Sequence, residues 1–434
     1  MSLWRLAVRS ISAVLIVSGS APCLAQTFSV GHKSTFTASR SSTGTPRTLS
    51  RGNWSELSKL IPGHPNTFNF ATSVAISGDT VVVAAQNAYT AAYAFVKSSS
   101  GWGALPVAAL NMPPSSNHTI APVAVDGDTI VVGDISGGAG YPSYAYVYVK
   151  PAGGWNDMLP TAVLTPSDTI DGCFGDSVAI SGDTIVVGDV GGCDFATDAG
   201  AAYVYVKPAS GWTDSTQTAK LTASDGVSTD FFGASVSISG GTVAVGAPQL
   251  TGTGKAYVFV QPATGWTDMT QTAELTASDA QPNFGVGSSV SVSGDNILVG
   301  APSIYNLNYP PGNAYLFTKP PSGWVNMTQT AELLPASTRP NQNFGCSVAL
   351  SGNLAAVGAR GFGTPPNSEE GGVYIFQGPV GGWKNATGFT VLTAADAHYF
   401  NHTGASVGMS GKVLVTNTSF VSSFSGAAYV FGSP

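Results

Sequence analysis

The sequence predicts an all-β fold, a seven-bladed β-propeller built from four-stranded antiparallel blades. Three observations predict it. A core segment, "SVAISGDTIVV" at Ser177, recurs in seven copies, and one tryptophan accompanies each copy. The segment at residues 53–60, ahead of the first copy, resembles the fourth strand that the last copy lacks. Strand-rich repeats with a period of about 50 residues are typical of propellers, in which each repeat forms one blade.

The repeated core changes little from copy to copy. The copies begin at Ser73, Pro122, Ser177, Ser235, Ser289, Ser347 and Ser406. In each, a first strand of the type "FGxSVAI" leads into a Ser-Gly-Asp hairpin turn, where glycine supplies a positive φ. The second strand is apolar on both faces, as expected of a strand that is covered on both sides. The third, "AAYVYVK", alternates with a period of two, and the fourth, "TAKLTA", follows a tryptophan.

Tryptophan gives a second count of the blades. Outside the first 26 residues the chain has seven, at Trp54, Trp102, Trp155, Trp212, Trp266, Trp324 and Trp383. Their equal placement favours a structural role between neighbouring blades over carbohydrate stacking. The last copy ends after its third strand, so "NWSELSKL" (53–60) is predicted to be the missing fourth strand of blade seven. Without it that blade would keep an unpaired edge. Trp54 to Leu60 is three residues shorter than Trp212 to Leu221, which leaves the register open.

The N-terminal residues predict export. Residues 1–26 combine the basic Arg5 and Arg9, an apolar stretch at 11–17 and small residues before Gln26, as in a signal peptide. A lipid anchor on Cys23 is the alternative. Residues 27–53 form a Ser/Thr-rich leader that we expect to be flexible, and 54–434 form the propeller. Because no later run approaches about 18 apolar residues, no membrane insertion is predicted. The expected location is secreted, extracellular or at the cell surface.

Charge narrows the class of partner. Beyond the leader the chain carries 11 basic and 24 acidic residues. This acidic balance disfavours nucleic acid and anionic membranes, and it leaves cationic partners, metal ions and neutral sugars open. We expect a monomer. Motifs of serine hydrolases, zinc proteases and P-loop enzymes are absent from the sequence, so no enzymatic activity is predicted.

Two paired motifs carry a family resemblance. Phe232-Gly233 is followed by Gly246-Ala247-Pro248, and Phe284-Gly285 by Gly300-Ala301-Pro302. With the half-motifs Phe174-Gly175 and Phe344-Gly345, the chain resembles the FG-GAP repeat family, best known from integrin α-subunit propellers. The variant here looks most like exported microbial repeat proteins. The resemblance implies a seven-bladed propeller and non-catalytic cell adhesion or binding.

Calcium sites are not carried over from that resemblance. Integrin-type repeats often hold calcium in a D-x-D-x-D-G loop between the first two strands. Here that loop is only Ser181-Gly182-Asp183, too short to wrap an ion that takes six to eight oxygen ligands. No calcium or other cofactor is therefore expected. The aspartates of these turns are interpreted as turn formers, at Asp79, Asp128, Asp183 and Asp295.

Strand order predicts where ligands would bind. Loops after strands two and four emerge on one face and vary in sequence, and variable loops on a rigid scaffold often bind ligands. This face is predicted to hold 189–200, 303–312 and 360–371. Its candidate ligand-binding residues are Asp189, Asp194, Asp198, Tyr305, Tyr309, Phe362 and Glu369. The competing interpretation is sequence drift in loops exposed to solvent.

Cysteine and histidine suggest two further features. Cys173 and Cys193 lie in loops at the same face of blade three, so an exported protein is predicted to join them in a disulfide, with Cys346 as a buried thiol. His64, His118, His398 and His402 precede first strands of adjacent blades and are candidates for a transition-metal site with Asp396. The favoured interpretation is that they are polar loop residues too far apart to share an ion.

The function predicted from these features is non-catalytic binding of an extracellular glycan or protein through the variable-loop face. A multivalent lectin with one site in each blade is a first alternative, and agglutination would distinguish it. A hydrolase or lyase acting on polysaccharide at the same face is a second, and turnover of a sugar substrate would reveal it. Fold alone does not choose among them.

Overall fold

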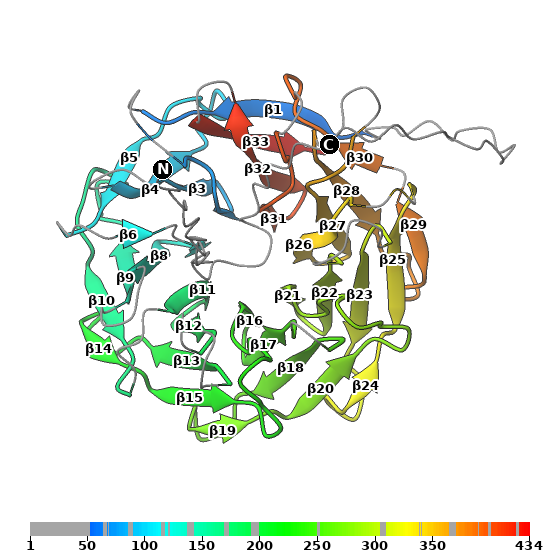
Figure 1. The fold of residues 1–434 in the computed structure, drawn as a ribbon. Coiled ribbons are helices and arrows are strands. Elements are labelled where there is room, and N and C mark those ends of the chain that lie inside the picture. The colour runs from blue at the N-terminus through cyan, green and yellow to red at the C-terminus, as the bar shows by residue number, and fades with distance from the viewer. Residues whose placement is uncertain are drawn as a thin grey trace, which may run out of the picture.

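The computed structural model places seven four-stranded antiparallel sheets in a ring around a central axis (Figure 1). The residues it describes are 53–63, 67, 69–85, 90–113, 118–119, 122–136, 143–168, 173–191, 199–249, 252–303, 310–337, 339, 341–363, 370–388, 390–397, 401–421 and 425–434. The predicted all-β seven-bladed propeller is confirmed. The signal peptide and nearly all of the predicted leader lie outside the described residues.

The first four blades follow the repeat from the axis outward. Blade one comprises β2 (Val74–Ser77), β3 (Thr80–Ala84), β4 (Thr90–Val96) and β5 (Ala108–Asn111). Blade two comprises β7 (Val123–Asp126), β8 (Thr129–Ser136), β9 (Tyr144–Val149) and β10 (Ala162–Thr165), and the short β6 (His118–Thr119) also pairs with β8. Blade three comprises β11 (Phe174–Ser181), β12 (Thr184–Asp189), β13 (Ala201–Val206) and β15 (Ala219–Thr222). Blade four comprises β16 (Ser235–Ser239), β17 (Thr242–Ala247), β18 (Lys255–Val260) and β20 (Ala273–Thr276).

The last three blades complete the ring. Blade five comprises β21 (Ser289–Ser293), β22 (Asn296–Ala301), β23 (Asn313–Thr318) and β25 (Ala331–Pro335). Blade six comprises β26 (Phe344–Ser351), β27 (Leu354–Ala359), β28 (Gly372–Gln377) and β30 (Thr390–Leu392). Blade seven comprises β31 (Val407–Ser410), β32 (Val413–Val421), β33 (Ser425–Gly432) and β1 (Ser55–Leu60).

The closing strand predicted from the sequence is confirmed. β1, from the N-terminal end of the propeller, pairs antiparallel with β33 at the C-terminal end, as the blue and red strands of Figure 1 show. The register runs from Ser55 opposite Gly432 to Leu60 opposite Ala428, with an irregularity between Glu56 and Ser58. Leu60 occupies the same place as Leu221 in blade three, which pairs with Ala202. The register that the sequence left open is thereby settled.

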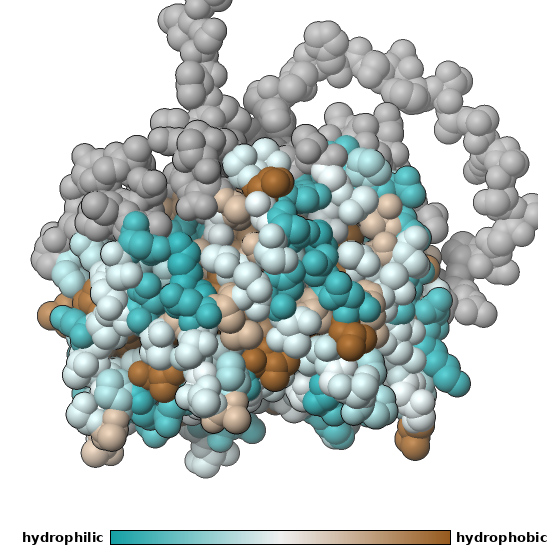
Figure 2. All heavy atoms as spheres, turned by 90° about the horizontal axis from the view of Figure 1, so that it is seen from below, coloured by the Kyte–Doolittle hydropathy of each residue, from teal (hydrophilic) through white to brown (hydrophobic). Residues whose placement is uncertain are grey.

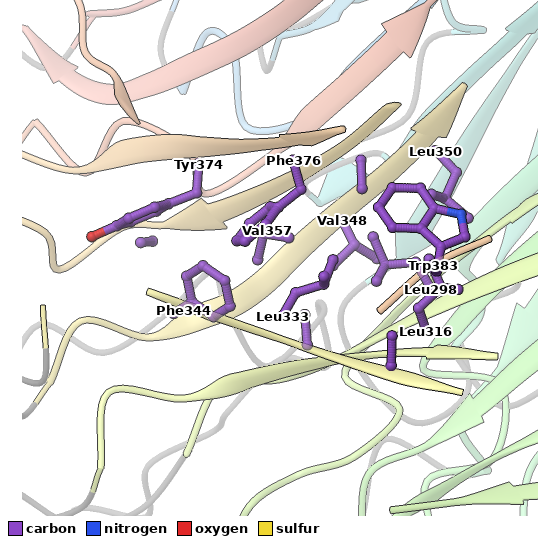
Figure 3. Close-up of a cluster of buried hydrophobic side chains, with 14 of the residues drawn as sticks. Leu298, Leu316, Leu333, Phe344, Val348, Leu350, Val357, Tyr374, Phe376 and Trp383 are labelled. Carbon is purple, nitrogen blue, oxygen red and sulfur yellow. The ribbon is translucent and has the colours of Figure 1, made fainter. Parts of the chain in front are cut away.

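Each tryptophan packs between two blades, as predicted. Figure 3 shows the core between blades five and six, where Trp383 and Phe344 lie with Leu298, Leu316 and Leu333. Leucines and alanines of one blade's outer strands meet the aromatic residues of the next blade, so each apolar core spans an interface between blades. Corresponding cores contain Trp54, Trp155, Trp212, Trp266 and Trp324, and Trp102 packs against another.

Glycines bring the inner ends of neighbouring blades into close contact. A Cβ added to Gly246, in the Gly-Ala-Pro segment of blade four, would lie 2.0 Å from the carbonyl oxygen of Gly287 in blade five. In blade five this contact glycine is Gly287, two residues beyond the Phe284-Gly285 motif. The same contact recurs between Gly133 and Gly175, Gly188 and Gly233, Gly300 and Gly345, and Gly358 and Gly404. The glycines of the two motifs therefore let adjacent blades approach, because any side chain would collide with backbone.

The tryptophan motif also covers the outer edges of the blades. β14 (Ser215–Thr216), which belongs to the motif of blade three, pairs in parallel with β10 of blade two. Asp214 accepts a hydrogen bond from the Val163 backbone N–H at 2.8 Å, and Gln217 bonds both the N–H and the hydroxyl of Ser167. The same parallel pairing is made by β19 (Met269–Thr270), β24 (Met327–Thr328) and β29 (Ala386–Gly388). Each added strand protects an edge that would otherwise be open to pairing with another chain.

The side of the ring seen in Figure 2 has no large apolar patch among its coloured residues. Residues of intermediate hydropathy and patches of hydrophilic residues cover most of it, and hydrophobic ones stand as separate spots. The exposed large apolar residues include Val206 and Val260, which end the third strands of two blades. Within the part of the chain that the structure describes, no helix is long and apolar enough to cross a membrane.

Candidate functional site

The two faces of the ring differ in what they carry. First strands end and second strands begin at the turn face, where Gly182 and Asp183 alone separate β11 from β12. Gly182 has a φ of 57°, and the Asp183 carbonyl accepts the Lys207 N–H at 2.8 Å. Lys207 also pairs its ammonium with the Asp183 carboxylate. The interpretation of this aspartate as a turn former is confirmed, and the same backbone bond is made by Asp79, Asp128 and Asp295.

The opposite face, called the loop face here, is where first strands begin and second strands end. β11 begins there beside the end of β12, since Phe174 pairs with Asp189. A central cavity of about 200 Å³ lies at this end of the axis. Every blade contributes residues from the start of its first strand. The lining consists of Thr72, Ser73, Pro122, Val123, Asp176, Ser177, Val178, Ala234, Ser235, Val236, Ser288, Ser289, Val290, Cys346, Ser347, Val348, Ala405, Ser406 and Val407.

The serines of this lining link one blade to the next. The Ser177 hydroxyl donates to the carbonyl oxygen of Gly233 in the following blade at 2.7 Å. Ser235, Ser289 and Ser347 donate in the same way to Gly287, Gly345 and Gly404, at 2.8, 2.9 and 2.8 Å. The hydroxyl oxygens of Ser73 and Ser406 instead accept the backbone N–H groups of Val123 and Val74. In blades three to six, the serine hydrogens are therefore engaged by backbone carbonyls.

Asp176 is the one carboxylic acid among the described residues that line the cavity. Its side chain is 5% exposed, and its Oδ1 atom has no hydrogen-bond partner among the described residues. Burial, followed by the negative charge of Asp189, raises the pKa of Asp176 well above its usual range. A carboxylate that lacks compensation is costly in such a place, so burial favours the protonated acid unless a cation accompanies it.

A pH-dependent gain in stability is expected from Asp176→Asn. The folded-state pKa of Asp176 is raised, so the folded protein binds a proton that the unfolded chain releases above about pH 4. Asp176 therefore favours the folded state most strongly below about pH 4, and this contribution to the free energy of unfolding is lost as pH rises toward the folded-state pKa. Replacing it with a neutral amide should therefore raise the melting temperature at pH 7 and change it little near pH 3.5. Melting curves of both proteins across this range check the prediction, and a constant difference would contradict it.

The predicted loop-face residues fall into two groups. Asp189 ends β12 at 3% exposure and accepts the Gly191 N–H at 3.1 Å. Phe362 is 7% exposed, and its ring lies edge-on to Tyr374 with centroids 5.9 Å apart. Both side chains are thus in the interior rather than on the exposed loop surface that was expected. Asp194, Asp198, Tyr305, Tyr309 and Glu369 lie outside the described residues, and their binding role stays a prediction.

The cysteines are placed only in part. Cys173 is fully buried at the start of blade three, in a small apolar group with Val190 and Ala234. Cys193 lies outside the described residues, so the disulfide stays a prediction. Cys346 is buried, as expected, and its thiol donates to the Gly404 carbonyl oxygen at 3.4 Å.

The histidine hypothesis gains no metal site from the structure. His64 and His398 lie outside the described residues, and the structure describes His118 only as backbone of β6. Burial and the positive charge of Arg360 lower the pKa of His402 to about 4, which leaves this imidazole neutral at pH 7. Asp396 forms an ion pair with Lys59 at 2.5 Å and accepts the Tyr429 hydroxyl at 2.6 Å. Among the described residues, no group of three metal-ligating side chains occurs.

Asp176 is the residue that the sequence analysis missed. The signal was available in the first-strand motif, because Asp176 stands where the other six copies have Thr72, Ala121, Ala234, Ser288, Cys346 and Ala405. Asp176 is the one acidic residue at this position of the repeat, and a charge that the other copies lack points to a role beyond the fold. Only the closed ring shows that this position faces the axis.

Comparison with known proteins supports the repeat assignment. The family model described as "FG-GAP repeat" matches residues 160–205, 215–259, 269–317 and 327–376, four consecutive repeats. The crystal structure of the WD40 β-propeller domain of Doa1 is similar in fold. Its TM-score is 0.50 and its identity 11%, over 88% of this chain and 97% of that one. No curated protein matches the chain. Four matched repeats on a closed ring of seven blades identify the chain as an FG-GAP repeat β-propeller.

Proposed function

We propose that this protein is a non-catalytic, extracellular or cell-surface binding protein that recognises a glycan or a protein through its loop face. FG-GAP propellers are binding and adhesion scaffolds, which supports the general class. The observation that carries the choice of face is the asymmetry of the ring. The turn face carries two-residue turns such as Gly78-Asp79 together with the tryptophan turns, which change little between repeats, whereas the connections 190–200, 302–312 and 360–371 at the loop face differ in sequence.

The rigidity of the scaffold supports the same choice. Blades are joined by apolar cores, by serine-to-carbonyl hydrogen bonds and by the added parallel strands. A rigid base allows loops to vary in sequence without loss of fold, and it lowers the entropy lost when a ligand binds. The cavity at the centre of the loop face adds a concave surface of the kind that ligands favour.

The first experiment is a glycan array with the mature protein, run with and without a chelator. Reproducible sugar binding supports the glycan form of the proposal, and sensitivity to chelator would revive the histidine metal hypothesis. A blank array directs the search to protein partners by pull-down from cell surfaces. Agglutination by the monomeric protein would favour the multivalent lectin, and turnover of a bound polysaccharide would contradict a non-catalytic role.

The choice of face has its own test, with two matched variants. Arg339 is exposed between β25 and β26, at the loop face, and Lys384 is exposed between β28 and β29, at the turn face. Arg339→Cys and Lys384→Cys are each coupled to the same bulky maleimide polymer. Coupling at 339 is expected to reduce ligand binding strongly, and coupling at 384 to leave it unchanged. Equal loss at both positions would contradict recognition through the loop face.

A further inference from the structure

We propose that the central cavity binds the primary ammonium group of a small organic molecule, with the Asp176 carboxylate as its counter-ion. The cavity is built from seven blades, and Asp176 brings the single carboxylate among its described lining residues. This inference does not depend on the proposed function. An amine can occupy the cavity whether or not the surrounding loops bind a macromolecule.

The hydrogen-bonding character of the wall favours a donor. Ser177, Ser235, Ser289 and Ser347 give their hydroxyl hydrogens to glycine carbonyls of the next blade. A hydroxyl has one hydrogen and two lone pairs, so these four oxygens have only lone pairs left to offer. In blades three to six these serines therefore bring no free hydroxyl hydrogen to the lining, whereas the Ser73 and Ser406 oxygens accept backbone N–H groups. An ammonium group, with three hydrogens and no lone pair, suits the serines of blades three to six, and the carboxylate of Asp176 disfavours an anion.

Asp176 supplies the charge that makes the match specific. Its Oδ1 atom has no hydrogen-bond partner among the described residues, although only 5% of the residue is exposed. Among the described lining residues there is no lysine or arginine, so these residues provide no compensating cation. Buried carboxylates are normally paired or hydrogen-bonded. The neighbouring Asp189 adds negative charge rather than relieving it.

Size and charge together select an organic amine over a metal ion. A volume of about 200 Å³ is far more than one water-sized ion requires. Divalent hard cations prefer several carboxylates or a dense oxygen shell, whereas the described lining residues present one carboxylate. The room beyond the ammonium can take a sugar ring or an alkyl chain, whose hydroxyl donors would meet the serine oxygens. Amino sugars and lysine side chains share the required chemistry.

Isothermal titration calorimetry on the full mature protein tests the proposal. The probes are glucosamine and lysine blocked at its α-amino and carboxyl groups, and each has its N-acetylated form as a control without the charge. At least one probe is expected to bind, and acetylation of its amine to weaken binding by about tenfold or more, which corresponds to about 1.4 kcal/mol. The probe that binds distinguishes an amino sugar from a lysine side chain as the source of the ammonium.

The variant Asp176→Asn links the binding to the cavity. It keeps the shape of the side chain and removes its charge, and we expect it to lose binding by about tenfold or more. Its melting temperature at pH 7 should be at least that of the parent, so that lost binding is not lost folding. Three results would overturn the proposal: neither amine binds, the acetylated forms bind as well, or Asp176→Asn binds unchanged. Binding of potassium or calcium chloride alone, without either amine, would overturn it too.

Discussion

Removing residues 27–61 is expected to lower the melting temperature sharply, whereas removing residues 27–50 should leave it nearly unchanged. The first deletion takes away β1, the fourth strand of blade seven. It would expose the edge of β33, whose backbone groups pair with β1 from Ser55 to Leu60. The second deletion removes only residues that precede the closing strand.

The size of the effect follows from what β1 buries. Trp54 packs into the core between blades six and seven, and Leu60 into the core between blades seven and one. Loss of a buried leucine typically costs about 2–5 kcal/mol and loss of a buried tryptophan about 3–5 kcal/mol. The Lys59–Asp396 ion pair and the bond from the Ala395 N–H to Glu56 also go. The deletion therefore lowers the free energy of unfolding by an amount comparable to the whole stability of a typical domain, which is about 5–15 kcal/mol.

Thermal denaturation of the two truncated proteins measures this difference. Two point variants refine it, because Leu60 is fully buried and Leu57, on the same strand, is 48% exposed. Leu60→Ala should lower the melting temperature clearly, and Leu57→Ala should lower it much less. If both truncated proteins melted at the same temperature, the closing strand would not stabilise the ring.

The sequence predicted the ring and its closure because repetition reveals topology. What it left open was the register of β1, and the structure gives a physical reason for the shortened segment. In blade three the residues between Trp212 and Lys220 include β14, which pairs with the preceding blade. β1 follows Trp54 directly and has no such added strand, yet Lys59 pairs with Asp396 as Lys220 pairs with Asp168. The lack of a strand equivalent to β14 therefore explains why the segment from Trp54 to Leu60 is three residues shorter than its counterpart in blade three.

The candidate site was less predictable than the fold. Strand order correctly assigned loops to faces, but it carries no information about how deeply a loop residue is buried. Phe362 therefore looked available for stacking although its ring packs on Tyr374. Asp176 was overlooked because a single strand does not reveal which of its residues line the axis of a closed ring. Only the tertiary arrangement brings seven first strands together around one cavity.

The glycine contacts between blades give the second large prediction, for Gly246→Ala. A methyl group at this position would lie 2.0 Å from the Gly287 carbonyl oxygen and 2.3 Å from the Ser235 hydroxyl. Both neighbours are held in place, because the Ser235 hydroxyl donates to that same carbonyl at 2.8 Å. Relief would require blades four and five to separate, which opens the core that they share. Overpacking of this kind costs about 3 kcal/mol.

The matched control is Gly153→Ala, because an added Cβ there meets nothing within 4 Å and Gly153 lies on an exposed turn. Thermal denaturation should give a melting temperature well below the parent for Gly246→Ala and close to the parent for Gly153→Ala. Equal melting temperatures would mean that adjacent blades can separate at the motif at little cost. A lower melting temperature for Gly246→Ala alone would explain why the Gly-Ala-Pro segment begins with glycine. Only glycine allows neighbouring blades to approach closely enough to share an apolar core.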